Sequence, residues 1–380
     1  MRLHSLDGLR VLAEFSIVQY NLFGPHGYLL PPVIEDLTSF FFVLSGFCVT
    51  FSHTADYRDP QPSAMEVFRH RLLVRVMPVF ICSLLLGLIA DAQCMESIMF
   101  PVGFILHFVM LSPWSGLPVA VNEPSWYIVS LAWLWAGFAI SPDVWPYKRR
   151  PLACLLVLYI LSCIVFIIIT PVGYESIRGV PVLRCFEFAI GCCTAHSIRR
   201  GDRISHWAIS LTVVGALFGI LTAYYVIEWQ FDDTHFEQDD PSNCTTPPWP
   251  ITDRTYVKDL SVRRIYGRAS LMWAALIFVL AHDDMHCTSM PLITDFLRNP
   301  SVHFVNRFSL EVYLYHKPVA ALLRVVTTPY IDKMWTESVF LITVYCFACL
   351  MHMHFHPRIR RAAETVLEWM YPSRPIAVVV

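Results

Sequence analysis

The sequence is poor in charged residues. Only 15% of its 380 residues are charged, whereas soluble chains carry about 25%. The charges also nearly balance, because 28 Lys and Arg stand against 30 Asp and Glu, which gives a net charge of −2 at pH 7. The low charge argues against a soluble domain, and the lack of a basic excess argues against a nucleic-acid partner.

Charge is missing altogether from one long stretch. Residues 151–170 contain no charged side chain, and a helix of about twenty residues is as long as the hydrocarbon core of a bilayer is thick. Hydrophobic residues make up 56% of the chain, and its mean hydropathy is +0.51. We therefore expect an all-α, polytopic membrane protein of about ten transmembrane helices, in contact with membrane lipid.

The chain also lacks the features of a secreted or a repetitive protein. Asp7, Arg10 and Glu14 interrupt the apolar residues near the start, so no cleavable signal peptide is predicted. There is no internal repeat, which argues against a secondary transporter built from inverted repeats. Residues 1–380 are expected to form a single membrane domain.

The predicted spans are the long apolar segments of the sequence. Ten of them can be recognised: 9–24, 34–52, 75–92, 124–141, 151–170, 180–197, 207–227, 266–282, 303–325 and 335–353. Residues 98–111 form a shorter apolar segment.

The distribution of Lys and Arg predicts the orientation. Basic clusters follow the second, fourth, sixth and tenth spans, and no Lys or Arg lies between Arg75 and Lys148. Because basic residues collect on the cytoplasmic side, both termini and the tail from about 357 to 380 are predicted to be cytoplasmic. A crossing by 98–111 would place every later basic cluster outside, so this segment is interpreted as re-entrant or superficial. The long loop 228–264 then lies on the other side of the membrane.

The first span carries a polar stripe. At helical spacing Arg10, Glu14 and Asn21 fall within about 40° of one another, and Arg10 and Asn21 are roughly 16 Å apart along the axis. Polar residues within a membrane usually face a cavity or a partner. The stripe therefore either faces a cavity, or its Arg10–Glu14 part is an ion pair that holds neighbouring helices.

Six short motifs follow one another along the chain. They are LDGLR (6–10), SFFFVLSGF (39–47), RLLVRVMP (71–78), SWYI (125–128), RCFEFAIG (184–191) and FSLEVYLYHKP (308–318). In order and type they resemble the motifs of the acyltransferase-3 family of membrane O-acyltransferases.

The resemblance implies a function. Members transfer an acyl group, usually acetyl, from acyl-CoA on the cytoplasmic side to a hydroxyl of a carbohydrate, lipid or similar acceptor. Acyl-CoA would be a donor substrate, with no permanently bound cofactor. Arg10 matches the arginine associated with the donor, and Arg71 and Arg75 would add positive potential for the donor phosphates.

Two positions depart from the family pattern. Asn21 stands where the resemblance implies a histidine acting as base, and Leu131 stands where many members have a glutamate. An amide cannot accept a proton, and the loss of a general base costs about 10²–10⁴-fold in rate. The chain therefore either uses another base, or is a catalytically impaired relative that acts as a binding or transport-like protein.

Three residues are candidates for a replacement base. His316 lies in the last motif, on a span rich in ionisable groups. Glu14 shares the stripe with Asn21, but a neighbouring Arg10 would keep its carboxylate charged and weakly basic. His26 lies five residues after Asn21 and off the same helical face, in an expected loop.

The remaining candidates concern the acceptor and metals. Trp126, Arg184 and Glu187 lie in family motifs and are interpreted as acceptor-binding or architectural residues. The histidines of segment 351–356 alternate along the sequence, so on a helix they point in different directions. No metal site is predicted there.

Overall fold

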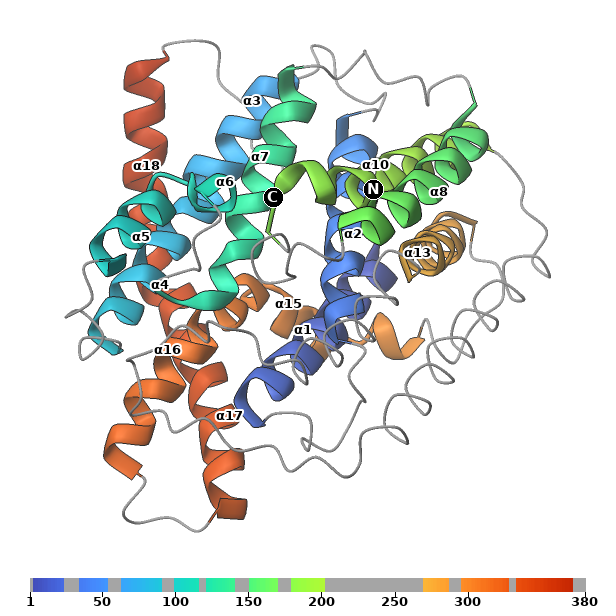
Figure 1. The fold of residues 1–380 in the computed structure, drawn as a ribbon. Helices are drawn as coiled ribbons and strands as arrows, with labels where there is room; N and C mark the ends of the chain where they lie inside the picture. The colour runs from blue at the N-terminus through green and yellow to red at the C-terminus, as the bar shows by residue number, and fades with distance from the viewer. Residues whose placement is uncertain are drawn as a thin grey trace.

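The computed structural model describes residues 3–23, 34–53, 63–90, 99–115, 121–140, 150–169, 179–201, 269–286, 295–327 and 333–371. Within these residues the regular elements are helices, and there is no strand (Figure 1). The all-α prediction is confirmed for this part of the chain.

The helices follow the predicted apolar segments. In chain order they are α1 (His4–Phe23), α2 (Ile34–His53), α3 (Ala64–Arg69), α4 (Met77–Ala90), α5 (Met99–Phe108), α6 (Ser112–Ser115), α7 (Trp126–Ile140), α8 (Pro151–Ile169), α10 (Pro181–Arg199), α13 (Ala269–His286), α15 (Pro300–Asn306), α16 (Ser309–Thr327), α17 (Lys333–Leu350) and α18 (His356–Met370). The expected span 207–227, the loop 228–264 and His26 lie outside the described residues.

Two pairs of helices are continuous. A π-helical segment, His70–Val76, joins α3 to α4, and a second one, Met351–Phe355, joins α17 to α18. The two resulting helices, Ala64–Ala90 and Ser338–Met370, are long and apolar enough to cross a bilayer by length and hydropathy. Among the described residues these two alone meet that criterion, so the count of ten spans stays a prediction.

The structure changes three of the predicted boundaries. The third span was expected from residue 75, but its helix begins at Ala64, where Ser63 and Glu66 form a capping box. The tail expected from about 357 begins as helix α18. The predicted span 303–325 is broken between α15 and α16, where the Arg307 and Phe308 amides donate to the carbonyls three residues earlier and close the end of α15.

Helix α5 is too short to cross a bilayer. Its ten residues rise about 15 Å, half the thickness of the hydrocarbon core. The chain turns directly after it, at Met110, whose φ is +61°. Residues before Met99 lie outside the described part of the chain, so the interpretation of 98–111 as a segment that does not cross stays a prediction.

Helices α2 and α10 cross at two glycines. A Cβ on Gly46 would lie 1.9 Å from the carbonyl oxygen of Phe188, and a Cβ on Gly191 would lie 1.9 Å from that of Val43. The two backbones are therefore in direct contact, as small residues allow in membrane helices. Both glycines belong to motifs recognised in the sequence. At least part of each motif is therefore explained by the close packing of α2 against α10.

Helix α1 lies between two groups of helices. Figure 1 shows α2, α8, α10 and α13 on one side of it, and α4, α16 and α17 on the other. It packs against α2, α13, α15, α16 and α17, which makes it the element shared by both groups. The side chains along its polar stripe are therefore directed among other helices.

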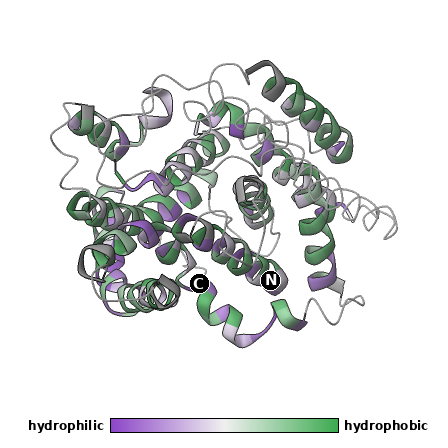
Figure 2. Cartoon of the chain, turned by 60° about the horizontal axis from the view of Figure 1, so that its bottom comes forward, coloured by the Kyte–Doolittle hydropathy of each residue, from purple (hydrophilic) through white to green (hydrophobic). Residues whose placement is uncertain are grey.

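Much of the outer surface is apolar. Hydrophobic residues cover most of the helices in Figure 2, and polar residues are confined to short stretches. Helix α8 exposes six large apolar side chains: Leu152, Leu156, Val157, Ile160, Leu161 and Ile164. A contiguous surface of this kind is unfavourable in water and suits contact with lipid.

Candidate functional site

Arg10 lies at a junction of four segments. Its side chain is half-buried on α1, within electrostatic range of Cys48 on α2, Tyr127 on α7 and Arg71 on the π-helical segment. Among the described residues no hydrogen bond or salt bridge to Arg10 is formed. An arginine held between helices without such a partner is available to bind an anion or a polar ligand.

Three further arginines continue this positive region. Arg71 donates to the hydroxyl of Ser52 at 3.2 Å and is within electrostatic range of Arg75. Arg75 is exposed and lies within range of Arg360 on α18. The structure thus brings the three predicted donor-binding residues into one region, which we call the arginine cluster: Arg10, Arg71, Arg75 and Arg360.

Arg360 was not among the predicted site residues. It comes from the tail region, almost 300 positions after Arg71. Its guanidinium donates to Glu311 at 3.2 Å, and Glu311 also bonds to His352 at 2.8 Å. The position of Arg360 in the sequence does not predict that it lies near Arg75, because the two are brought together by the continuous α17–α18 helix.

Glu14 does not pair with Arg10. Its side chain is 2% exposed, and neither carboxylate oxygen has a hydrogen-bond partner in the part of the chain that the structure describes. It is within electrostatic range of Glu311 and Tyr345, as well as of Arg10. The ion pair considered from the sequence is therefore not formed, although the two residues share a helix face.

An aromatic contact series connects the surroundings of Arg10 to His316. The Tyr127 hydroxyl donates to the carbonyl oxygen of Phe41 at 3.3 Å, and its ring lies 5.8 Å from that of Tyr313. The ring of Tyr313 in turn lies 6.0 Å from that of His316. The series begins at Tyr127, which is within electrostatic range of Arg10, and ends at His316, the leading base candidate.

His316 has a defined tautomer. Its Nδ1 lies 2.6 Å from the carbonyl oxygen of Tyr313, which can only accept, so Nδ1 carries the proton. Nε2 then presents a lone pair and, within the described residues, has no hydrogen-bond partner. The side chain is completely buried, and the adjacent Lys317 is paired with Glu123. The geometry gives His316 the chemical capacity of a general base.

Asn21 lies far from the arginine cluster. It is half-buried near the end of α1, and the regular helix places it roughly 16 Å along the axis from Arg10. The two residues share a face, as the sequence predicts, but they lie at different depths.

Arg184, Glu187 and Trp126 form a buried assembly. Arg184 and Glu187 are paired at 3.1 Å, and the guanidinium lies 5.6 Å from the Trp126 ring. Glu187 also accepts a hydrogen bond of 2.5 Å from Ser39 on α2. These contacts tie α2, α7 and α10 together. The structure brings these three residues together, and their contact with an acceptor stays a prediction.

A second buried network supports the segment before α7. His107 on α5 bonds through Nδ1 to Ser112 at 2.7 Å and through Nε2 to Ser125 at 2.6 Å. Ser125 donates to the carbonyl oxygen of Asn122 at 2.5 Å. The Asn122 amide donates to Leu314 on α16 at 2.9 Å. His107 was not among the candidate residues from the sequence, although its partner Ser125 is the first residue of the motif SWYI.

Comparison with known proteins agrees with the motifs. The family model described as an acyltransferase domain, that of the acyltransferase-3 family, matches residues 3–353. No curated protein and no solved structure matches the chain. Since the family model covers nearly all of the sequence, the chain belongs to the acyltransferase-3 family of membrane acyltransferases.

Proposed function

We propose that the protein transfers an acyl group, acetyl in the simplest case, from acyl-CoA to a hydroxyl of a carbohydrate, lipid or similar acceptor. The observation that carries the donor assignment is the arginine cluster, in which Arg10 has no salt bridge within the described part of the chain. The CoA part of the donor carries phosphates, which are the groups that guanidinium binds with two parallel hydrogen bonds.

The length of the α1 stripe suits this donor. Arg10 and Asn21 lie roughly 16 Å apart along the helix. In acyl-CoA a flexible arm likewise separates the phosphates from the thioester. Phosphates held at the arginine cluster would leave the acyl group deeper in the helix bundle, towards Asn21.

His316 is the proposed base. Its Nε2 would accept the proton of the acceptor hydroxyl as the oxygen attacks the thioester carbonyl carbon. The tetrahedral intermediate then collapses, the carbon–sulfur bond breaks, and the CoA thiolate takes up the proton from the imidazolium. Asn21 would orient the hydroxyl or the carbonyl by hydrogen bonding, because an amide can donate and accept without titrating.

Contacts between helix ends support cytoplasmic termini. Ser5 at the start of α1 bonds to Asp284 at the end of α13, and Arg199 at the end of α10 bonds to the carbonyl oxygen of Phe51 at the end of α2. Basic clusters follow the spans that end with α2 and α10, and the alternation of the predicted spans puts the start of α1 and the end of α13 on the same side. The arginine cluster would then face cytoplasmic acyl-CoA.

Binding and turnover of the detergent-purified protein test the proposal. Equilibrium binding of acetyl-CoA should weaken at least about tenfold in Arg10→Lys, because a point charge cannot replace a bidentate fork. The matched control is Arg150→Lys, an exposed arginine at the start of α8, which should bind as the parent does.

Turnover is followed as CoA release with a panel of carbohydrates and lipids. Equal donor affinity in the Arg10→Lys and parent proteins would contradict the donor assignment. Tight binding by the parent with no acyl transfer to any acceptor would indicate a binding protein in place of an enzyme.

A further inference from the structure

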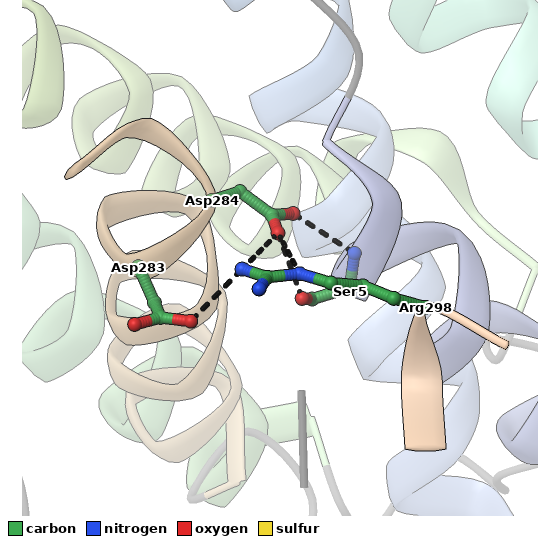
Figure 3. Close-up of polar contacts among 4 residues, drawn as sticks. All are labelled: Ser5, Asp283, Asp284 and Arg298. Carbon is green, nitrogen blue, oxygen red and sulfur yellow. Dashed lines mark hydrogen bonds and ion pairs between the residues drawn. The ribbon is translucent and has the colours of Figure 1, made fainter. Parts of the chain in front are cut away.

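The start of α1 is locked to two other segments. Arg298 lies between Asp283 and Asp284, with nitrogen–oxygen distances of 2.9 and 2.8 Å (Figure 3). Asp284 also accepts hydrogen bonds from the backbone nitrogen and the hydroxyl of Ser5, at 2.8 and 2.9 Å. The lock fixes the first turn of α1 relative to the end of α13 and the chain that enters α15.

One further contact joins α1 to the chain just before α15, and a cap fixes the start of α15. A Cβ on Gly8 would lie 2.3 Å from the carbonyl oxygen of Leu297, so the two backbones touch at this glycine. Asn299 caps α15 through a 2.9 Å bond from the Ser301 amide. Side chains that α1 and α15 direct towards each other are thus held on a rigid frame.

This frame places three metal-ligating side chains together. They are His4 and Asp7 on α1 and His303 on α15, whose ligand atoms all lie within 4.8 Å of one another. His303 Nδ1 lies 4.0 Å from the Asp7 carboxylate, and the two imidazole rings are 4.7 Å apart in an edge-on arrangement. His4 is exposed and the other two are half-buried, so an ion has a path from solvent.

The donor set has a defined preference. Two imidazoles and one carboxylate are typical ligands of Zn²⁺ and related divalent transition ions, and three protein ligands leave a position open for water. His4 and Asp7 are three residues apart, so they share a helix face, as in known helical metal sites.

The distances fit an ion after a small adjustment. Ligand atoms about 2.0–2.1 Å from a tetrahedral ion lie about 3.4 Å apart. The ligand atoms lie within 4.8 Å of one another, so no pair must approach by more than about 1.4 Å. The exposed side chain of His4, at the first residue of α1, can supply that movement.

We propose that His4, Asp7 and His303 form a binding site for a divalent transition ion of the zinc type. The ion would join α1 to α15 beside the Arg298 lock. Asp7 also acts electrostatically on Cys48, as Arg10 does, so the ion would sit at the same end of the bundle as the arginine cluster. The proposal is independent of acyl transfer, since it concerns binding alone.

Zinc titration of the full-length, chelator-stripped protein in detergent tests the site. Calorimetry should show that His4→Gln and His303→Gln each bind one equivalent of Zn²⁺ fewer than the parent. The matched control is His354→Gln, which removes an exposed histidine of the segment between α17 and α18 and should keep the parent stoichiometry. Zinc should also raise the unfolding temperature of the parent and of the control, because it binds the folded state.

Two results would overturn the proposal. One is a parent protein that binds no zinc. The other is parent stoichiometry in either substituted protein. If His303→Gln fails to fold, the zinc stoichiometry of His4→Gln alone tests the proposal, because the exposed side chain of His4 can be changed without disturbing the core.

Discussion

The imidazole of His316 is bonded through Nδ1 to the carbonyl oxygen of Tyr313, three residues earlier on the same helix, at 2.6 Å. This bond selects the tautomer in which Nε2 can accept a proton. The sequence shows His316 only as a histidine within a family motif, and this bond gives it a specific chemical capacity. The first two predictions concern this nitrogen and the residue that stands in place of the family base.

Replacement of His316 by glutamine should lower turnover by about 10²–10⁴-fold, because the amide cannot accept the hydroxyl proton. Donor affinity should stay the same, since the proposed phosphate ligands are the arginines and not His316. The measurement is CoA release at saturating donor, with equilibrium binding of acetyl-CoA as the control. Parent-like turnover in His316→Gln would assign the base to another residue.

Asn21→His should change turnover little if His316 already serves as the base. Residue 21 lies on the same face of α1 as Arg10, so a histidine there would reach the same depth as the family's base. The measurement compares the turnover of three proteins: the parent, Asn21→His, and the protein that carries both Asn21→His and His316→Gln. A large increase in Asn21→His would show that proton removal at position 21 is limiting in the natural protein.

Alanine at Gly46 or Gly191 should destabilise the fold by at least about 1–3 kcal/mol, because the new Cβ would overlap a carbonyl oxygen of the facing helix. Gly137 provides the matched control, since a Cβ there meets no atom within 4 Å and the residue lies within α7. Gly137→Ala should be neutral or slightly stabilising. Thermal unfolding in detergent measures all three, and equal midpoints for Gly46→Ala and Gly137→Ala would refute the close crossing of α2 and α10.

Epitope tags test the proposed orientation. A tag inserted within 228–264 should be accessible from outside the cytoplasm, and a tag within 198–206 should be accessible only from the cytoplasmic side. The measurement is antibody labelling of cells before and after permeabilisation. If both tags report the same side, the predicted crossing by 207–227 is wrong. If the two tags report exchanged sides, 98–111 should be reconsidered as a true span.

Much of the site could be read from the sequence because the relevant signals are local. Arg10, Glu14 and Asn21 share a face of α1 through helical periodicity alone, and the basic motif that contains Arg71 and Arg75 comes from one continuous segment. The glycines of the second and fifth motifs likewise mark positions where no side chain fits. Low charge and apolar length were sufficient to predict an all-helical membrane protein.

Other relationships depend on which helices become neighbours. Arg360 joins Arg75 only because α17 and α18 continue as one helix beside the π-helical segment, and His107 reaches Ser125 only because α5 folds back towards α7. The Arg10–Glu14 ion pair, one of the two alternatives that the sequence left open, is absent for the same reason. Periodicity places two side chains on one face, but neighbouring helices decide which groups each of them meets.

The sequence by itself therefore determined the class of the protein, its helices, its family and the polar stripe of α1, since these follow from composition, periodicity and short motifs. The tertiary structure decided the tautomer of His316, the burial of Glu14, the membership of Arg360 in the arginine cluster and the meeting of His4 and Asp7 with His303. Each of these rests on contacts between side chains that are distant in sequence, and such contacts are set by the packing of whole helices.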